Sequence, residues 1–384
     1  MRYLISKLTQ ASLNSQNPNA TGIILYNPVR IKGNTSKVGQ KISEFRSFFQ
    51  LMAKTEVLLV IGASAGGTAI LPEVIKQLPD DKTISVMVVL HLSKSSVGEL
   101  LVNRLQKFTS FKCKIPIHEE PLRAGHIYLA MPDHHLMVKE NKILLGRGPL
   151  ENRYRPSIDA LFRSAAVAFG SRVIGIILTG MLEDGASGMY AIRNCGGVCI
   201  VQDPEEAKYP DMPQAVLNVV KPEFAVPVSE MGQAIKKSIA MAANRKKGKI
   251  PPEIVKEAEI AERVNIGIEQ VEDLGNLSKI SCPDCGGSLW EMNDNGFTRY
   301  RCHVGHAFSE NGLIGSMEVS AESTLWIALR MLEERKNLLK QLADREKKRG
   351  KRNLATTYLD RSRELEAHAQ KLKEILFAVA RDPR

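Results

Sequence analysis

The chain has 384 residues, of which 43% are hydrophobic, so it is long enough for one large domain with a sizeable core and for accessory segments beside it. Its formal net charge is +11, but much of this charge lies in two short runs, residues 245–249 and 345–352, and no basic stripe is interleaved with aromatic residues. This pattern argues against nucleic acid as a partner, and membrane insertion is excluded because no apolar stretch reaches the length of a membrane span.

The N-terminal residues 1–53 are polar and mixed, with one short apolar run, Ile23–Leu25. They cannot bury a core, so we predict a flexible extension ahead of the first domain. The first 22 residues lack the continuous apolar segment of a signal peptide. The six cysteines also show no disulfide framework, and together these features predict a cytoplasmic protein.

The segment Glu56–Leu71 combines a buried strand, a glycine-rich corner and the start of a helix. Val57–Ile61 is a continuous apolar run typical of a parallel strand, and Gly62–Gly67 reads GASAGG. This corner fits the nucleophile elbow G-x-S-x-G, in which glycines let the turn present a serine hydroxyl, here Ser64, above the sheet. It also fits a dinucleotide-binding fingerprint with its middle glycine replaced, and an ordinary tight turn.

The residue after the next strand separates the first two alternatives. Ser85–Leu90 is that strand, and His91 follows it. A dinucleotide site requires an acidic residue at this place to bind a ribose hydroxyl, whereas a serine nucleophile requires an imidazole. His91 therefore favours the elbow and makes Ser64 the candidate nucleophile.

Further strands and helices alternate along the region. The predicted helices are Val97–Phe108, Ser157–Phe169 and Ala186–Asn194, and the predicted strands are Gly125–Ala130, His135–Lys139, Val173–Leu178 and Gly197–Gln202. Such alternation, with continuously apolar strands, predicts an α/β domain over residues 54–243 with a doubly wound, mostly parallel sheet in three layers. Functional side chains in such sheets gather at the carboxyl ends of the strands.

The loop that follows the VIGIIL strand contributes a carboxylate, Asp184. Ser64, His91 and Asp184 all follow strands of the predicted sheet, so we expect nucleophile, base and orienting carboxylate to meet at one edge. His135 is the alternative imidazole, and Glu183 is the alternative carboxylate. The order Ser, His, Asp along the chain differs from the order in α/β-hydrolases, which argues against that fold.

Six sequence motifs follow one another in this region. They are IGASAGG (Ile61–Gly67), VVLH (Val88–His91), YLAMPDHHL (Tyr128–Leu136), RPSIDALF (Arg155–Phe162), ILTGMLEDGASGM (Ile177–Met189) and the DPEEA and MPQAV pair (Asp203–Val216). Through these motifs residues 55–240 resemble the catalytic domain of the chemotaxis protein-glutamate methylesterases. Several motifs in one register are far more specific than any one of them.

The resemblance implies a serine esterase without a catalytic cofactor, which hydrolyses glutamate methyl esters on chemoreceptor-type proteins and also deamidates glutamine. It implies that Ser64 is the nucleophile, His91 the general base and Asp184 the carboxylate that orients the imidazole. The backbone N–H of Met181 would help to form the oxyanion hole. The implied partners are a methylated chemoreceptor or similar signalling protein and a methyltransferase or regulator.

The chain departs from the family pattern near the site and at its N-terminus. Ala65 replaces the hydroxyl residue that often follows the nucleophile, and Leu182-Glu183 replaces a glycine-containing pair before the aspartate. Fewer than 60 residues precede the first strand, so we expect no N-terminal receiver domain of the kind usual in the family. The alternative function is a non-catalytic adaptor that only docks on a signalling partner.

A metal-binding pattern follows the predicted domain. Residues 244–278 are charged and contain a proline pair, which predicts a linker, and residues 279–315 contain the motifs CPDCGG and CHVGH. The four residues with the spacing of a tetrahedral structural zinc site are Cys282, Cys285, Cys302 and His306. His303 is the alternative fourth ligand. A metal-free loop and a redox CxxC are the competing interpretations, although the redox motif lacks its usual preceding strand and following helix.

Residues 316–384 are predicted to form a helical hairpin. Its two apolar stripes are Leu325, Leu329, Leu332 and Leu339 on the first helix and Leu365, Ala369, Leu372 and Leu376 on the second, with Gly350 near the turn. An antiparallel pair within one chain would bury both stripes together. Burial between two chains would instead give a homodimer.

Overall fold

The computed structural model describes residues 55–92, 98–245, 248–262, 271–272, 274–294 and 297–379. The predicted N-terminal extension, residues 1–53, lies outside the described residues. The described residues all belong to one compact unit, Met52–Arg384. None of the helices within these ranges is both long enough and apolar enough to span a bilayer.

A seven-stranded sheet lies at the centre of residues 55–245, which we call the sheet domain. Its strands lie in the order β3-β4-β2-β1-β7-β8-β9, and neighbouring strands pair in parallel. Their bounds are β1 Val57–Ala63, β2 Ile84–Leu90, β3 Lys112–Lys114, β4 His126–Leu129, β7 Val173–Ile177, β8 Val198–Gln202 and β9 Phe224–Val226. Strands β1 and β2 are buried along their whole length, as their continuous apolar runs predict.

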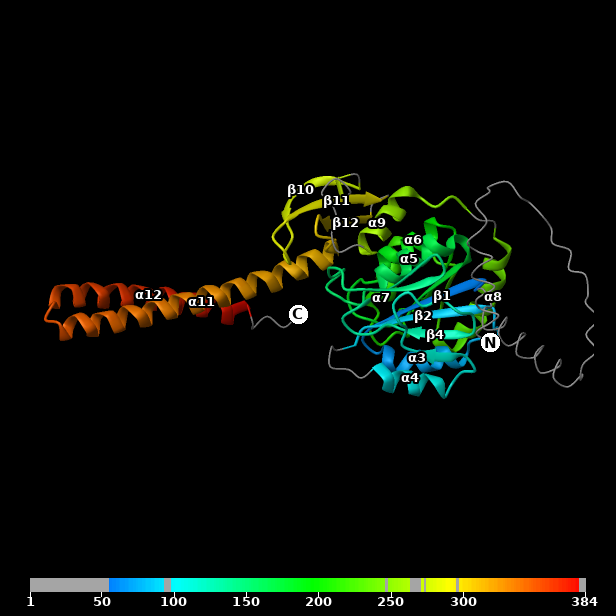
Figure 1. The fold of residues 1–384 in the computed structure, drawn as a ribbon, viewed down its shortest axis with the longest axis horizontal. Coiled ribbons are helices and arrows are strands. Elements are labelled where there is room, and N and C mark those ends of the chain that lie inside the picture. The colour runs from blue at the N-terminus through cyan, green and yellow to red at the C-terminus, as the bar shows by residue number, and fades with distance from the viewer. Residues whose placement is uncertain are drawn as a thin grey trace, which may run out of the picture. The chain divides into compact units, whose positions relative to one another are not determined.

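Helices cover both faces of this sheet (Figure 1). One face carries α3 (Gly67–Lys76), α4 (Gly98–Gln106) and α8 (Met231–Asn244), and the other carries α5 (Ile158–Phe169), α6 (Ala186–Asn194) and α7 (Asp211–Val219). Short 3₁₀ turns, η1 (Gly170–Arg172) and η2 (Val228–Glu230), precede β7 and α8. Successive side chains of a strand point to opposite faces, so Leu58 packs into one core and Leu59 into the other. The doubly wound, three-layer prediction is confirmed.

The strand His135–Lys139 forms as predicted and is β5, but it lies outside the parallel sheet. It pairs antiparallel with β6 (Lys142–Gly146), and this hairpin packs against α5. The intervening residues Glu140 and Asn141 both have positive φ values, 47° and 63°, as the tightest hairpin turns require. A two-residue turn without glycine is a weak sequence signal, which is why β6 was not predicted.

Helix α9 (Pro252–Glu262) lies within the interval predicted to be a linker. Its residues Ile254 and Ala258 are buried, and the helix packs against α5 of the sheet domain. The charge of this interval is not all solvated, because the carboxylate of Glu257 is buried and accepts two hydrogen bonds from Arg299 at 2.7 and 2.8 Å. Charge density alone does not distinguish a solvated residue from a buried ion pair.

A small antiparallel sheet follows, and we call its residues 276–309 the Cys/His module. Its strands, in spatial order, are β10 (Asn276–Ser281), β11 (Ser288–Asp294), β12 (Phe297–Cys302) and β13 (Ala307–Ser309). The module and the first turn of the next helix share a core of six buried residues, which are Cys282, Leu289, Tyr300, Cys302, Phe308 and Leu313. This core is far smaller than either core of the sheet domain.

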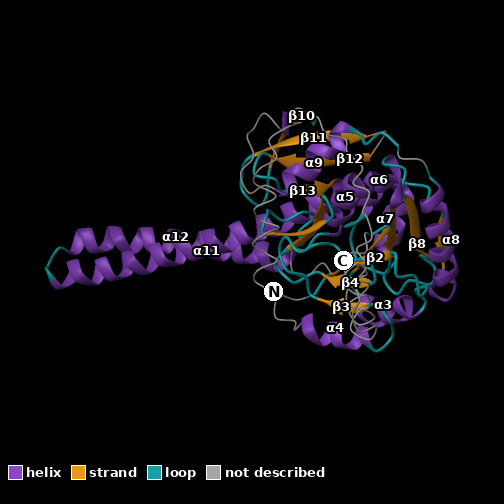
Figure 2. Ribbon diagram, turned by 45° about the vertical axis from the view of Figure 1, so that its right-hand side comes forward, coloured by secondary structure: helices purple, strands orange, loops and turns teal. Residues whose placement is uncertain are grey.

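The predicted C-terminal hairpin is confirmed. Helices α11 (Glu310–Lys348) and α12 (Arg352–Val379) lie side by side (Figure 2). Their shared core consists of Leu329, Ala369 and Leu376, with Leu325, Leu332 and Leu372 packed against it. Helix α11 begins earlier than predicted, at Glu310, because the Ser309 hydroxyl caps it by accepting a hydrogen bond from the Gly312 N–H at 3.1 Å.

Candidate active site and metal site

Ser64, His91 and Asp184 come together at the carboxyl edge of the sheet. The Nδ1 atom of His91 lies 3.1 Å from Ser64 Oγ, and its Nε2 atom lies 3.0 Å from Asp184 Oδ2. Ser64 is 9% exposed and Asp184 is 1% exposed. Ser64 is thus largely buried, and the carboxylate that faces the imidazole is shielded from water almost completely.

The turn between β1 and α3 presents Ser64. Gly66 precedes α3 with a φ of +80°, a left-handed conformation that glycine adopts without strain. The Ser64 N–H donates to the Thr179 carbonyl at 3.0 Å, and the Gly67 N–H donates to the Ser64 carbonyl at 2.9 Å. Ser64 is thereby fixed beside the N-terminus of α3, where backbone N–H groups and the helix dipole favour negative charge.

Tyr154 packs on the imidazole of His91. The two rings are stacked, with their centroids 3.7 Å apart and their planes 11° apart. Burial, and then the charge of Asp184, raise the pKa of Tyr154, so its phenol stays protonated. The stack holds the plane of the imidazole. Tyr154 was not predicted as a site residue, although its position directly before the RPSIDALF motif was an available signal.

Asp184 is held at the N-terminus of α5. Its Oδ2 atom accepts a hydrogen bond from the Ile158 N–H at 2.7 Å. Its Oδ1 atom accepts hydrogen bonds from the Ser157 hydroxyl at 2.9 Å and from the Asp159 N–H at 3.2 Å. Backbone donors at a helix N-terminus stabilise negative charge. This environment suits a carboxylate whose role is to orient an imidazole.

A second carboxylate, Asp159, lies beside Asp184 in a buried site. It accepts hydrogen bonds from the N–H groups of Gly185 and Gly188 at 3.0 and 2.6 Å. Burial, and then the charge of Asp184, raise the pKa of Asp159 to about 7. The Asn152 amide donates to both carboxylates, at 2.6 Å to Asp159 and 3.3 Å to Asp184. Asp159 lies within the RPSIDALF motif but was not predicted to be a site residue, and no sequence signal pointed to Asn152.

Neither alternative side chain takes part in this arrangement. His135 is 1% exposed, and its Nε2 atom donates to the Pro149 carbonyl at 2.8 Å while its Nδ1 atom accepts from the Ser157 N–H at 3.2 Å. Burial lowers the pKa of His135, so a neutral ring supports the start of α5 with both nitrogens occupied. Glu183 accepts a hydrogen bond from Asn311 of α11 at 2.5 Å.

The loop after β7 carries the predicted oxyanion donor, Met181. A Cβ atom added at Gly180 would lie 2.9 Å from the Cβ of Ser64, so this backbone passes directly against the serine. Among the hydrogen bonds of the described residues, the Met181 N–H has no acceptor. Leu182 takes a left-handed φ of +65°, a strained conformation for leucine, at one of the positions where the resemblance implies a glycine-containing pair.

The four residues predicted to be zinc ligands form one cluster in the Cys/His module. The donor atoms of Cys282, Cys285, Cys302 and His306 all lie within 4.8 Å of one another. The Sγ atoms of Cys285 and Cys302 are 3.7 Å apart, and Cys302 Sγ is 3.5 Å from His306 Nδ1. Such separations are the edges of a tetrahedron around an ion with bonds of about 2.0–2.3 Å. The cluster, whose imidazole is His306 rather than His303, could hold a metal ion.

Tight turns carry the ligands of this cluster. The Gly286 N–H donates to the Cys282 carbonyl at 2.8 Å, and the Gly305 N–H donates to the Cys302 carbonyl at 2.9 Å. The carboxylate of Asp284 lies 3.9 Å from the outer ring nitrogen of His306. This separation is an ion-pair distance and is too long for a hydrogen bond to the ring.

Comparison with known proteins gives matches to the sheet domain. Residues 59–235 match the family model for the CheB methylesterase domain. A Leptospira interrogans protein with the provisional name protein-glutamate methylesterase/protein-glutamine glutaminase is 32% identical over 176 residues, which are 46% of this chain and 91% of that protein. The protein-glutamate methylesterase/protein-glutamine glutaminase of Thiobacillus denitrificans is 33% identical over 226 residues, 56% of this chain and 62% of that protein.

A solved structure is also similar to the chain. The catalytic domain of the Thermotoga maritima CheB methylesterase has 28% sequence identity and a TM-score of 0.45, and the similarity covers 47% of this chain and 97% of that domain. The family-model match ends at residue 235. The Cys/His module and the helical hairpin therefore lie beyond it.

Proposed function

Because the chain belongs to the CheB methylesterase family, whose named relatives are carboxylic ester hydrolases, we propose that it hydrolyses the γ-methyl ester of glutamate side chains on a chemoreceptor-type protein. The observation that carries this proposal is the hydrogen-bonded series of Ser64, His91 and Asp184 at the sheet edge. In this proposal Ser64 is the nucleophile, His91 the general base and Asp184 the orienting carboxylate.

The reaction proceeds by acyl transfer through a covalent intermediate. With its Nε2–H directed at Asp184, the imidazole has a free Nδ1 lone pair that takes the proton of Ser64 as Oγ attacks the ester carbonyl carbon. The tetrahedral intermediate collapses, and His91 returns the proton to the departing methoxide, so that methanol leaves. Water then attacks the acyl-enzyme with the help of His91, which releases the glutamate carboxylate and restores Ser64.

Backbone donors stabilise the oxyanion in this mechanism. The N–H of Met181 is free among the described hydrogen bonds and belongs to the loop that passes against Ser64. The N-terminus of α3, three residues after the serine, adds its dipole. No metal or organic cofactor is needed for these steps.

The same site would deamidate glutamine, because an amide differs from the ester only in its leaving group, ammonia. The names of the relatives include this second activity. A methylated chemoreceptor is the proposed substrate, and a methyltransferase or another regulator is a further partner. We place the activity in the cytoplasm, where the free thiols Cys113, Cys195 and Cys199 stay reduced.

The rival function is a non-catalytic adaptor that docks on a signalling protein. The two functions are separated by incubating the full-length protein with a methylated receptor and following methanol release, with mass spectrometry of the receptor peptides. Loss of the methyl groups with the wild type but not with Ser64→Ala supports the esterase. If neither receptor esters nor a simple activated ester is cleaved, the adaptor is favoured.

We propose that the cluster of three cysteines and His306 holds a structural zinc ion. Thiolate and imidazole donors are those that zinc prefers, and four protein ligands leave no open position for a substrate. The small core of the module is a further argument, because such a core rarely stabilises a fold without a metal. The zinc therefore has a structural role in this proposal and takes no part in ester hydrolysis.

A homodimer through the C-terminal helices is also proposed. Helix α11 exposes large apolar side chains on one stripe, with Ile327 50%, Met331 60% and Leu338 55% exposed. A second hairpin packed against this stripe would remove these side chains from water. Light scattering of the wild type and of Met331→Lys with Leu338→Lys tests the dimer, which the double variant should dissociate.

A further inference from the structure

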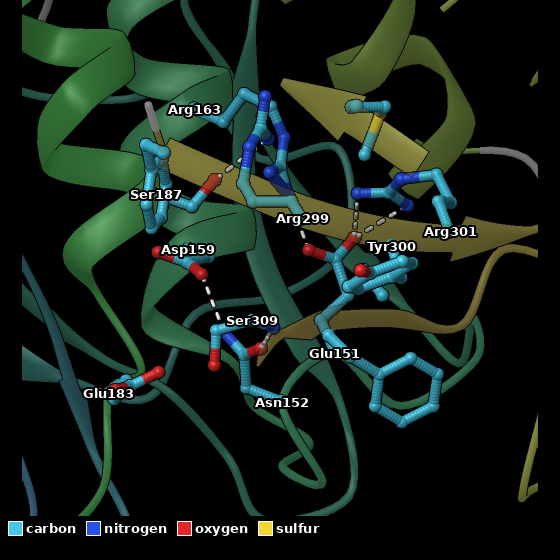
Figure 3. A pocket seen from close by; sticks show the side chains of 14 residues that line it. Glu151, Asn152, Asp159, Arg163, Glu183, Ser187, Arg299, Tyr300, Arg301 and Ser309 are labelled. Carbon is cyan, nitrogen blue, oxygen red and sulfur yellow. Dashed lines mark hydrogen bonds and ion pairs between the residues drawn. The ribbon is translucent and has the colours of Figure 1, made fainter. Parts of the chain in front are cut away.

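Asn152 lies between the candidate catalytic carboxylate and the Cys/His module. In Figure 3, Asn152, Asp159 and Ser309 lie together in a small pocket where the two parts of the chain meet. The Oδ1 atom of Asn152 accepts a hydrogen bond from the Ser309 N–H at 3.1 Å, and the Asn152 N–H donates to the Ala307 carbonyl at 2.8 Å. Both contacts come from β13 of the module.

These contacts decide which end of the amide faces the site. A side-chain amide has one acceptor end and one donor end. Because the Ser309 N–H occupies the acceptor end, the Nδ2 donor end of Asn152 faces Asp159 and Asp184. The reverse orientation would place a carbonyl oxygen against two carboxylates. Strand β13 therefore keeps a shared donor between two neighbouring acidic groups.

Strand β13 is in turn attached to the metal cluster. His306 directly precedes the strand, and the Cys302 N–H donates to the His306 carbonyl at 3.0 Å. The strand pairs with β12, with Arg301 opposite Ala307 and Arg299 opposite Ser309. An ion bound by Cys302 and His306 would fix the start of β13.

A buried ion network holds the module against the sheet domain. Arg301 donates to Glu151 at 3.2 Å, and Arg299 donates to Glu257 at 2.7 and 2.8 Å. Arg163 of α5 forms ion pairs with both carboxylates. These five side chains are buried, and separation of the module would leave charges unpaired. Asn152 directly follows Glu151 in the chain. Displacement of the docked module would therefore also displace the Asn152 amide.

We propose that Asn152 is a positioning residue through which the folded, metal-bound Cys/His module controls the candidate esterase site. The proposal rests on the function proposed above, because it concerns the efficiency of the same site. Asp184 then orients His91 correctly only when β13 holds the Asn152 amide. Loss of the metal then lowers turnover without any change to the nucleophile.

Ser309 allows a test with a matched control. Its φ is −72°, which proline also adopts, so the backbone accepts Ser309→Pro, which removes the N–H and places the proline ring where the Asn152 Oδ1 atom lies, so that the amide is displaced. Ser309→Ala keeps this N–H and loses the same helix-capping hydroxyl. For the full-length protein we expect Ser309→Pro to lower kcat about 10-fold with KM little changed, and Ser309→Ala to stay within about 2-fold of the wild type. Equal activity of the two variants would overturn the proposal.

A double-mutant cycle with Asn152→Ala tests the route. If the Ser309 N–H acts through the amide, Ser309→Pro has no further effect in the Asn152→Ala background. Additive losses would show that Ser309 acts by another route. Both single variants should also move the acidic limb of the kcat profile to higher pH, because loss of the Asn152 donor lets the Asp159 carboxylate retain a proton to higher pH. A merely structural defect would lower kcat without moving that limb.

NMR of the His91 ring N–H gives a readout that needs no activity. We expect this resonance to shift in Asn152→Ala, in Ser309→Pro and in chelator-treated wild type, and to stay unchanged in Ser309→Ala. An unchanged resonance in Asn152→Ala and after metal removal would overturn the proposal. If the wild type releases no methanol, the proposed function fails, and the resonance still reports on the coupling. Should Ser309→Pro lose its metal, Asn152→Ala with full metal content remains the deciding variant.

Discussion

The sheet domain and the Cys/His module maintain their folds by different means. In the sheet domain, two extensive hydrophobic clusters cover the two faces of strands such as β1 and β2. The module contributes five of the six buried residues of its small core, the sixth being Leu313 of α11. It also has a cluster of four potential metal ligands and buried ion pairs with its neighbours. One part is stabilised mainly by apolar burial, whereas the other depends on specific polar contacts.

In the proposed arrangement, the sheet domain supplies the candidate catalytic side chains and the Cys/His module positions one of them. The candidate catalytic side chains all belong to the part with the large core, so their backbone positions follow from the sheet. The module contributes β13, which contacts Asn152, and two arginines that neutralise buried carboxylates. If the proposed zinc is needed for the module to fold, this part is suited to adjust a site that the sheet domain provides.

Removal of the candidate nucleophile from the sheet domain should reduce activity more than any other change. Ser64→Ala should lower methyl ester hydrolysis by about 10³-fold or more, because the acyl-enzyme can no longer form. The unfolding free energy and the metal content should stay unchanged. Ser238→Ala is a matched control, since it removes another buried serine hydroxyl, in α8, that has no hydrogen-bond partner among the described residues. Activity of Ser64→Ala within a few-fold of the wild type would refute the elbow assignment.

A second test compares the two candidate imidazoles, His91 and His135. His91→Gln should lower kcat by about 10³-fold, because it removes the base beside Ser64. His135→Gln should lower kcat far less and should mainly lower the unfolding free energy, because this ring only bridges two backbone groups. Steady-state kinetics and thermal unfolding of both variants provide the ranking. The reverse ranking in kcat would reassign the base.

Removal of the metal tests whether the Cys/His module needs it to stay folded. The purified protein should contain about one zinc ion per chain, and Cys282→Ser combined with Cys285→Ser should lose it. Residues 276–309 should then become sensitive to proteases while the sheet domain stays resistant. Cys113→Ala is the control, because this thiol lies in β3 outside the cluster. Elemental analysis that finds no metal in protein purified without chelators would contradict the zinc assignment.

Lowering the pH tests the buried ion network that joins the Cys/His module to the sheet domain and helix α9. Burial alone would raise the pKa of Glu151 and of Glu257, but the neighbouring guanidinium groups more than reverse this and hold each pKa at about 2, below the ordinary value of 4.5. Each carboxylate therefore stabilises the fold above pH 4.5, and this contribution of about 3 kcal/mol is lost as the pH falls from 4.5 towards 2. Urea unfolding at several pH values measures the decline.

Glu257→Gln should lower the unfolding free energy at neutral pH by about 3 to 5 kcal/mol and make its decline in acid shallower. Glu333→Gln is the control, because Glu333 pairs with Lys373 at the surface of the hairpin and should leave both quantities unchanged. Identical acid profiles for Glu257→Gln and the wild type would show that the network does not stabilise the docked module.

Local patterns in the sequence are sufficient to predict the sheet, the hairpin and the residues that meet in the two candidate sites. Continuous apolar runs indicate buried parallel strands, and residues that follow such strands lie at one edge, which is why the sequence alone predicts that Ser64, His91 and Asp184 meet. The spacing of cysteines and His306 likewise reflects the geometry of a tetrahedral ion. The strands and the ligand spacing depend on residues that are close in the sequence, and the meeting of the three side chains follows from the parallel sheet.

Contacts between distant segments are decided only by the tertiary structure. Arg301 and Glu151 are 150 positions apart, and in the sequence each is indistinguishable from a solvated charge. Asn152 and Tyr154 acquire their roles only because β13 and His91 lie beside them. The physical reason is that burial of a polar side chain depends on which surfaces pack together, and its hydrogen-bond partners are then chosen by proximity in space rather than by any local pattern.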